Sequence, residues 1–148
     1  MEEITIANLE KADWEKAFEA KHATVYTIAP SQTILCVLEK EYVPIAAFKA
    51  IFEKITELAS SSLFKRFVFD KRKLAAFHQP TMEWYYLDWK TTVAPYGITE
   101  HRKLLPEAAW FRKTVEIAKL SLENRMPEEL RAKLDIQYCE SIEEALTS

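Results

Sequence analysis

Histidine and cysteine, the residue types that most often bind metals or act as nucleophiles, are few and widely separated in this 148-residue chain. No two histidines occupy i and i+4 positions with a carboxylate between them, and neither cysteine belongs to a Cys-x-x-Cys pair. We therefore expect no metal site. The residues concerned are His22, His78, His101, Cys36 and Cys139.

Nucleophilic chemistry finds equally little local support. A serine or cysteine nucleophile needs a base within reach and donors for the developing oxyanion, and no local pattern supplies them. Gly97 is the single glycine, whereas phosphate-binding loops and nucleophile elbows need backbone conformations that glycine adopts most easily. A site assembled from distant segments stays open, but we expect no catalytic residues, no cofactor and no enzymatic activity.

Asp70 stands out because it follows Phe67–Phe69 at the carboxyl end of a predicted strand, where α/β proteins tend to place ligands. A turn or helix-entry role is the alternative.

A basic run follows Asp70 directly, and a second one lies at His101–Lys103. If their strands are parallel neighbours, the two runs share one rim and form a positive patch, suited to an acidic partner or an anionic ligand. Solvated charged loops are the alternative. The first run consists of Lys71, Arg72 and Lys73.

The predicted helix from Pro80 to about Val93 carries more aromatic residues than one core-facing stripe needs. Trp84 projects away from the stripe, with Asp88 one turn further on. Such a helix is either buried on several sides or offers a surface to a partner, a second copy or an apolar ligand. The stripe itself consists of Met82, Tyr85, Tyr86, Trp89 and Val93.

Hydrophobic periodicity predicts the elements that position these residues. Two β-branched runs around Pro30-Ser31-Gln32 indicate an antiparallel hairpin, and a Ser141–Glu144 capping box starts the last helix. The order β-β-α-β-α-β-α-β-α predicts an α/β fold, a single-domain sandwich with a mixed β-sheet covered by helices. We expect strands over Thr24–Ala29, Thr33–Leu38, Phe64–Asp70, Ile98–Leu105 and Asp135–Cys139. We expect helices from Pro44 to Ser60–Ser62, from Pro80 to Val93, from Pro106 to about Asn124, from Met126 to about Lys133, and after Ser141.

The first 22 residues lie before this pattern. We assign residues 1–22 to an N-terminal extension and residues 23–148 to the domain. Within the extension, Ile4–Ile6 is typical of a short strand and Leu9–Phe18 of a short helix, because Trp14 and Phe18 are spaced i, i+4.

The composition is that of one globular domain, with 49% hydrophobic residues, 29% charged residues and a net charge of -3. The negative charge and the lack of a reader motif argue against nucleic-acid binding. No apolar run approaches the roughly 18 residues that span a bilayer, and residues 1–10 lack a signal-peptide pattern. We expect a cytoplasmic protein with no membrane span and with two buried free thiols.

Four features together resemble the SpoIIAA-like family, which is related to the STAS domains of anti-sigma-factor antagonists. They are the hairpin Val25–Leu38, the helix after Pro44, the Asp-ended strand Phe64–Asp70 and the closing run Ile136–Leu146. The likeness covers the chain beyond the extension. It implies a small α/β domain without known enzymatic chemistry, used for protein regulation or for holding an apolar ligand. In the antagonists a phosphorylatable serine follows the strand-end aspartate; here no serine occurs between Asp70 and Pro80, which argues against such a switch.

The first functional hypothesis is a non-enzymatic, STAS-like regulatory or protein-interaction module, with a protein partner or a homodimer. The alternative is a carrier or sensor of an apolar or anionic-headed, lipid-like ligand, with the aromatic helix lining its pocket. The expected binding surface comprises Asp70, Lys71, Arg72, Lys73, Trp84, Tyr85 and Asp88.

Overall fold

A six-stranded mixed sheet forms the centre of the computed structural model, which describes residues 14–29 and 31–148. Its strands lie in chain order from one edge to the other. The first three strands are antiparallel, whereas the third to the sixth run parallel. They are β1 (Trp14–Glu19), β2 (Ala23–Ile28), β3 (Thr33–Leu38), β4 (Arg66–Asp70), β5 (Glu100–Leu104) and β6 (Asp135–Tyr138).

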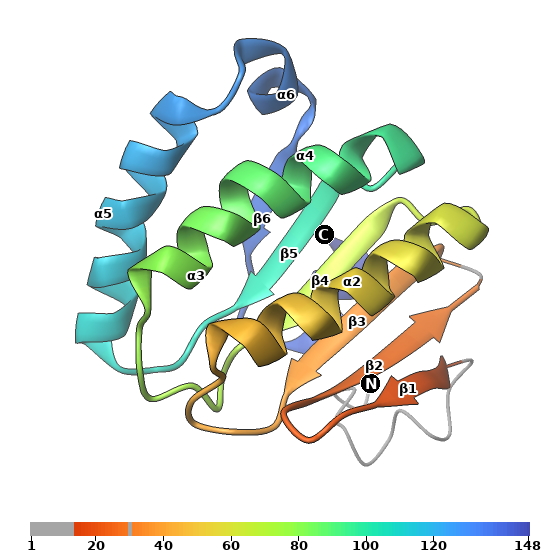
Figure 1. The fold of residues 1–148 in the computed structure, drawn as a ribbon, viewed down its shortest axis with the longest axis horizontal. Helices are drawn as coiled ribbons and strands as arrows, with labels where there is room; N and C mark the ends of the chain where they lie inside the picture. The colour runs from red at the N-terminus through yellow and green to blue at the C-terminus, as the bar shows by residue number, and fades with distance from the viewer. Residues whose placement is uncertain (1–13, 30) are drawn as a thin grey trace.

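Helices cover both faces of the sheet, one face much more fully than the other (Figure 1). The larger layer contains α2 (Ile45–Ser61), the helical segment Gln79–Val93 and α5 (Ala109–Arg125), while α7 (Ile142–Thr147) packs on the opposite face. This arrangement confirms the predicted α/β class with a mixed, helix-covered sheet. None of the helices in these ranges is long and apolar enough to cross a membrane. The segment Gln79–Val93 comprises α3 (Gln79–Glu83), η1 (Trp84–Trp89) and α4 (Lys90–Val93); η2 (Ala94–Tyr96) follows it, and α6 (Glu128–Lys133) precedes β6.

The central strands are buried on both faces, which explains their nearly continuous hydrophobic runs. In β4, Phe67 and Phe69 face the larger helical layer, whereas Val68 faces α7. β3 alternates in the same way, with Ile34 and Cys36 on the side of the larger layer. The phenylalanines of β4 therefore form the floor beneath the helical segment Gln79–Val93.

The N-terminal segment contains a strand where we expected a helix. The prediction over Leu9–Phe18 is wrong in its described part, because Trp14–Glu19 pairs antiparallel with β2. The i, i+4 pair Trp14 and Phe18 suggested a helix, but a register shift between Lys16 and Phe18 sends the two rings to opposite faces of the sheet. The predicted strand at Ile4–Ile6 lies outside the described residues.

Several local predictions are confirmed. β2 and β3 form the expected hairpin, and β4 and β5 are parallel neighbours. The Glu144 N–H donates a 3.1 Å hydrogen bond to the Ser141 hydroxyl at the start of α7, as the capping pattern predicts. The third long helix begins at Ala109, three residues later than the expected start at Pro106.

The helical segment Gln79–Val93 changes its pitch in the middle. Trp84–Trp89 is a π-helix, and the following Lys90 N–H donates to the Tyr85 carbonyl, five residues back. Such turns are wider than an α-helical turn and are frequent at functional sites. Here the π-helical turn lies above β4 and β5 and turns four large side chains inward, Tyr85, Tyr86, Trp89 and Lys90.

Candidate functional site

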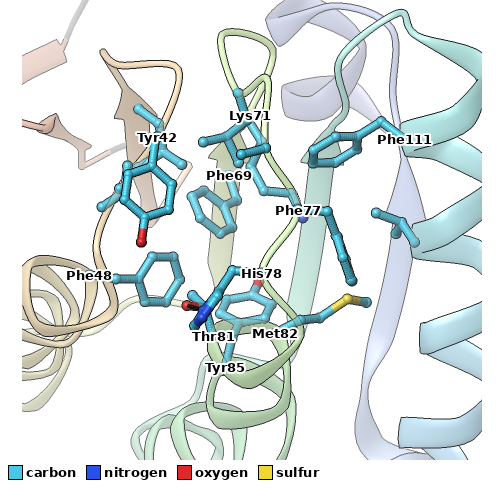
Figure 2. Close-up of a pocket in the computed structure, with 15 residues that line it drawn as sticks. Tyr42, Phe48, Phe69, Lys71, Phe77, His78, Thr81, Met82, Tyr85 and Phe111 are labelled. Carbon is cyan, nitrogen blue, oxygen red and sulfur yellow. Dashed lines mark hydrogen bonds between the residues drawn. The ribbon is translucent and has the colours of Figure 1, made fainter.

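A pocket opens at the carboxyl ends of β3 and β4, between α2, α3 and α5 (Figure 2). Ligands of parallel α/β sheets commonly bind at this edge. The pocket encloses about 550 Å³ of space not occupied by protein atoms, a volume that includes its opening to solvent. Its walls are mostly apolar and include Phe48, Phe69, Phe77, Met82, Phe111 and Val115.

The stretch between β4 and α3, residues 71–78, forms one side of the pocket. Backbone hydrogen bonds hold it in place: the Lys71 N–H donates to the Leu104 carbonyl at 2.9 Å, and the Ala75 N–H donates to the Glu41 carbonyl at 2.8 Å. Lys71 is thereby fixed at the end of β5. Its side chain extends into the space between Phe69 and Phe77 (Figure 2).

Lys71 is a buried cation in apolar surroundings. It is 8% exposed, and its amino group lies 5.3 Å from the centre of the Phe69 ring. Within residues 14–29 and 31–148, no side chain forms a hydrogen bond or salt bridge with that amino group. Burial therefore lowers the pKa of Lys71 from 10.5 to about 8.

The two basic residues that follow Lys71 form ion pairs with carboxylates and do not line the pocket. The Arg72 guanidinium donates to both oxygens of the Asp70 carboxylate, at 3.0 and 2.8 Å. The Lys73 amino group donates to Glu39 at 2.8 Å. The basic run therefore divides, with Lys71 directed inward and the other two forming ion pairs at the surface.

Tyr85 contributes a second polar group to the pocket. Its hydroxyl is buried, and no hydrogen-bond partner for it is found among the described residues. Burial raises the pKa of Tyr85 well above 10, so the hydroxyl keeps its proton and remains a donor. His78 and Thr81 add polar atoms, with the His78 Nδ1 2.7 Å from the Thr81 hydroxyl and His78 itself exposed.

Two further lysines lie behind Tyr85, in the core. Lys90 and Lys103 are fully buried, and each amino group lies about 5 Å from the centre of the Tyr85 ring, at 4.8 and 4.9 Å. The Lys103 amino group donates a 2.6 Å hydrogen bond to the Tyr86 hydroxyl, while that of Lys90 has no hydrogen-bond partner in the described part of the chain. Burial, and secondarily the charge of neighbouring lysines, lowers the pKa of both well below 10.5.

His101 lies on the same face of β5 as Lys103. It is fully buried between aromatic rings, 6.3 Å from Phe67 and 6.1 Å from Trp89 by ring centres. Neither ring nitrogen has a hydrogen-bond partner in the ranges described. Burial, followed by the charges of Lys90 and Lys103, lowers the pKa of His101 well below 6.5, so the imidazole is neutral at pH 7.

The predicted positive rim does not form. His101–Lys103 lies inside β5 and is buried, because β5 is flanked by β4 and β6 and covered on both faces. Arg102 points to the α7 side, where it donates to the Ser148 hydroxyl at 2.8 Å and to Asp135 at 2.9 Å. The basic residues of β5 therefore contribute no surface charge beside the run that follows Asp70.

The expected binding surface is only partly accessible. Asp70, Lys71 and Tyr85 are buried. Trp84 is half-buried against α2, with its ring centre 6.0 Å from that of Phe48. The remaining members, Arg72, Lys73 and Asp88, are exposed.

The sequence analysis missed most of the pocket wall and Lys90, and it placed Lys103 in a surface patch rather than in the core. A signal existed for Lys90, which follows Tyr86 by four residues on the buried stripe, and for Lys103, which alternates with His101 on one strand face. No local pattern marked Phe77 or Phe111, whose contributions depend on tertiary contacts.

No cluster of three or more histidine, cysteine, aspartate or glutamate side chains able to hold a metal occurs in the described part of the chain. No family model, curated protein or solved structure matches the chain significantly. The resemblance to the SpoIIAA-like family thus stays a prediction.

Proposed function

We propose that this protein binds a small, mainly apolar ligand whose polar end carries an oxygen acceptor, a carboxylate or a carbonyl group. The observation that carries the proposal is that Lys71 and Tyr85, two donors without partners in the described residues, line a pocket whose walls are mostly apolar. The role that fits is that of a carrier or sensor.

Energetics favour an oxygen between these two groups. Leaving a buried donor unbonded costs about 1–3 kcal/mol, and a buried charge without a partner costs more. A carboxylate or carbonyl oxygen would accept from the Tyr85 hydroxyl and from the Lys71 ammonium group together. Both unfavourable contributions would then be relieved by the same ligand atom or group.

The apolar part of the ligand would contact the ring-lined walls. Phe69 and Phe77 flank the Lys71 side chain, and Phe48, Met82 and Phe111 surround the remaining space (Figure 2). Each aliphatic carbon that leaves water there contributes about 0.8 kcal/mol. Pockets with apolar walls and few polar groups are typical of small-molecule sites.

The interaction-module hypothesis has less support from this geometry. Trp84, one residue of its expected surface, is in edge contact with Phe48 and Phe52 of α2, with ring centres 6.0 and 6.2 Å apart. Packing between two helices therefore accounts for an aromatic residue outside the core-facing stripe. A protein-binding role for Arg72, Lys73 and Asp88 stays a prediction.

The test is a titration of the full chain with 3-phenylpropanoate, followed by calorimetry or by NMR of the protein. We expect binding at the pocket, and we expect Lys71→Met to weaken it about tenfold, since a charge-assisted hydrogen bond contributes about 1.5–3 kcal/mol. Lys73→Met is the matched control, because this adjacent lysine is exposed and paired with Glu39. Absence of binding, or equal affinity in the two variants, would overturn the proposal.

A further inference from the structure

Lys71 combines three features that favour reaction of an amine with a carbonyl compound. It lines an open pocket, its surroundings are apolar, and no carboxylate within the described residues holds its amino group as an ammonium ion. Neighbouring Asp70 pairs with Arg72 instead. Desolvated lysines of this kind serve as imine-forming residues in other proteins.

We propose that Lys71 is a covalent attachment site for small apolar aldehydes and ketones, which it holds reversibly as an imine inside the pocket. The inference rests on the proposed function, because it needs a carbonyl ligand to enter this pocket. It deepens that function by naming the ligand class and the bond.

The reaction balances without any oxidant or reductant. The Lys71 nitrogen attacks the carbonyl carbon, a C–N bond forms, and the carbonyl π electrons move to the oxygen, which takes up a proton while the nitrogen loses one. The carbinolamine hydroxyl then takes up a proton from solvent and leaves as water while the nitrogen lone pair forms the C=N bond, which gives an iminium ion. Loss of the remaining N–H proton to solvent returns the proton taken up and leaves the neutral imine. The products are one imine and one water molecule.

Tyr85 is placed to assist the addition step. Its hydroxyl is a buried donor without a partner in the described residues, and its ring forms part of the same pocket wall (Figure 2). A hydrogen bond from this hydroxyl to the carbonyl oxygen would stabilise the negative charge that develops there. Tyr85 would thus act as a hydrogen-bond donor rather than as a base.

The protonation state of Lys71 supports this chemistry. With a pKa of about 8, roughly a fifth of the Lys71 side chains are free amines at pH 7.4, against about one in a thousand for an ordinary lysine. The core lysines Lys90 and Lys103 are less suitable, because both are fully buried and neither lines the pocket.

The test treats the full chain at pH 7.4 with limiting 3-phenylpropanal and cyanoborohydride, which reduces an imine to a stable amine. Peptide mapping by mass spectrometry then locates the adduct. We expect Lys71 to be labelled at least about tenfold more than its exposed neighbour Lys73. The same aldehyde should label Lys73→Arg at the same position and leave Lys71→Arg without the preferred adduct.

The outcomes separate the two proposals. Labelling spread evenly over the exposed lysines would overturn imine formation at Lys71. If 3-phenylpropanoate and 3-phenylpropanol bind the pocket while no preferred adduct forms, the imine inference fails and the ligand-binding function stands. If neither compound binds and no preferred adduct forms, both fail. Slower labelling of Lys71 in the presence of 3-phenylpropanol would place the reaction in the pocket, independently of any variant.

Discussion

The amino group of Lys103 donates a 2.6 Å hydrogen bond to the hydroxyl of Tyr86, and both side chains are completely buried. The same amino group lies 4.0 Å from the centre of the Tyr86 ring. An aromatic residue thus takes the place that a carboxylate occupies beside most buried lysines. Burial disfavours the ammonium form and lowers the pKa of Lys103 well below 10.5.

Lys90 is a second buried lysine beside the same ring, with its amino group 4.8 Å from the Tyr86 ring centre. Because this amino group has no hydrogen-bond partner in the described residues, its removal tests the cost of burying a lysine here. We expect Lys90→Met to raise the free energy of unfolding at pH 7 by about 1–2 kcal/mol, because a side chain of similar volume removes an unbonded buried amine. Urea denaturation measures the change. Lys113→Met, on the exposed side of α5, is the control and should alter stability little.

The pH dependence of the same variant has a definite sign. The folded-state pKa of Lys90 lies well below 10.5, so between these two values the unfolded chain binds the extra proton. The stability of the wild-type protein should therefore rise with pH in that window, by at most about 1.4 kcal/mol per unit for each such group. The rise should be smaller in Lys90→Met. A variant less stable than wild type, with an unchanged pH slope, would show that Lys90 is satisfied in the folded state.

His101 gives the corresponding effect on the acidic side. Its folded-state pKa lies well below 6.5, so unfolding takes up a proton as the pH falls below about 6.5, and stability is lost in that range. We expect His101→Leu to reduce the loss of stability between pH 6.5 and 5, measured by urea denaturation at each pH. His78→Gln, at an exposed position, is the control. An identical acid profile for wild type and His101→Leu would contradict the assignment of a neutral buried imidazole.

The sheet could be predicted where the sequence pattern is local. The hairpin of β2 and β3 and the helix after Pro44 follow from runs and spacings within about 20 residues. β1 could not be predicted, because its two large aromatic residues, Trp14 and Phe18, are four residues apart, a spacing typical of one face of a helix. In the structure the register shift between Lys16 and Phe18 places the two rings on opposite faces of the sheet.

The candidate site depends on contacts that no local pattern encodes. His101–Lys103 reads as a solvated run, yet Tyr86 and Trp89 from a helical segment earlier in the chain cover its inward side. The place of Lys71 after the strand makes it a candidate, but nothing local indicates that its side chain points inward while its backbone N–H donates a 2.9 Å hydrogen bond to the Leu104 carbonyl. The sequence therefore predicts that residues 71–73 lie at the carboxyl edge of the sheet. Only the tertiary structure shows that Lys71 points into the pocket whereas Arg72 and Lys73 form ion pairs.

Asp70 has a structural role that mutation can isolate. Its buried carboxylate accepts from the Arg72 backbone N–H at 3.1 Å as well as from the guanidinium, and so closes the turn that contains Lys71. We expect Asp70→Asn to lower the free energy of unfolding by about 1–3 kcal/mol, because the charge that balances Arg72 is lost. It should also weaken 3-phenylpropanoate binding through displacement of Lys71. The exposed Asp88→Asn serves as control, and wild-type stability in Asp70→Asn would exclude this role.

The affinity of the pocket for a carboxylate should depend on pH through Lys71. The ammonium form binds the anion, and the free protein loses that form as the pH rises through about 8. The affinity for 3-phenylpropanoate should therefore be constant well below pH 8 and fall above it, by at most about tenfold per pH unit, since each bound anion must then recruit one proton. Calorimetry at pH 7, 8 and 9 measures the affinity, and it measures the proton uptake from the dependence of the binding heat on the ionisation heat of the buffer.

Two controls accompany this titration. Lys71→Met should bind weakly at all three pH values with no proton uptake, whereas the uncharged 3-phenylpropanol should bind wild type equally well throughout. A carboxylate affinity that stays level from pH 7 to 9 in wild type would mean that the Lys71 ammonium group does not contact the ligand.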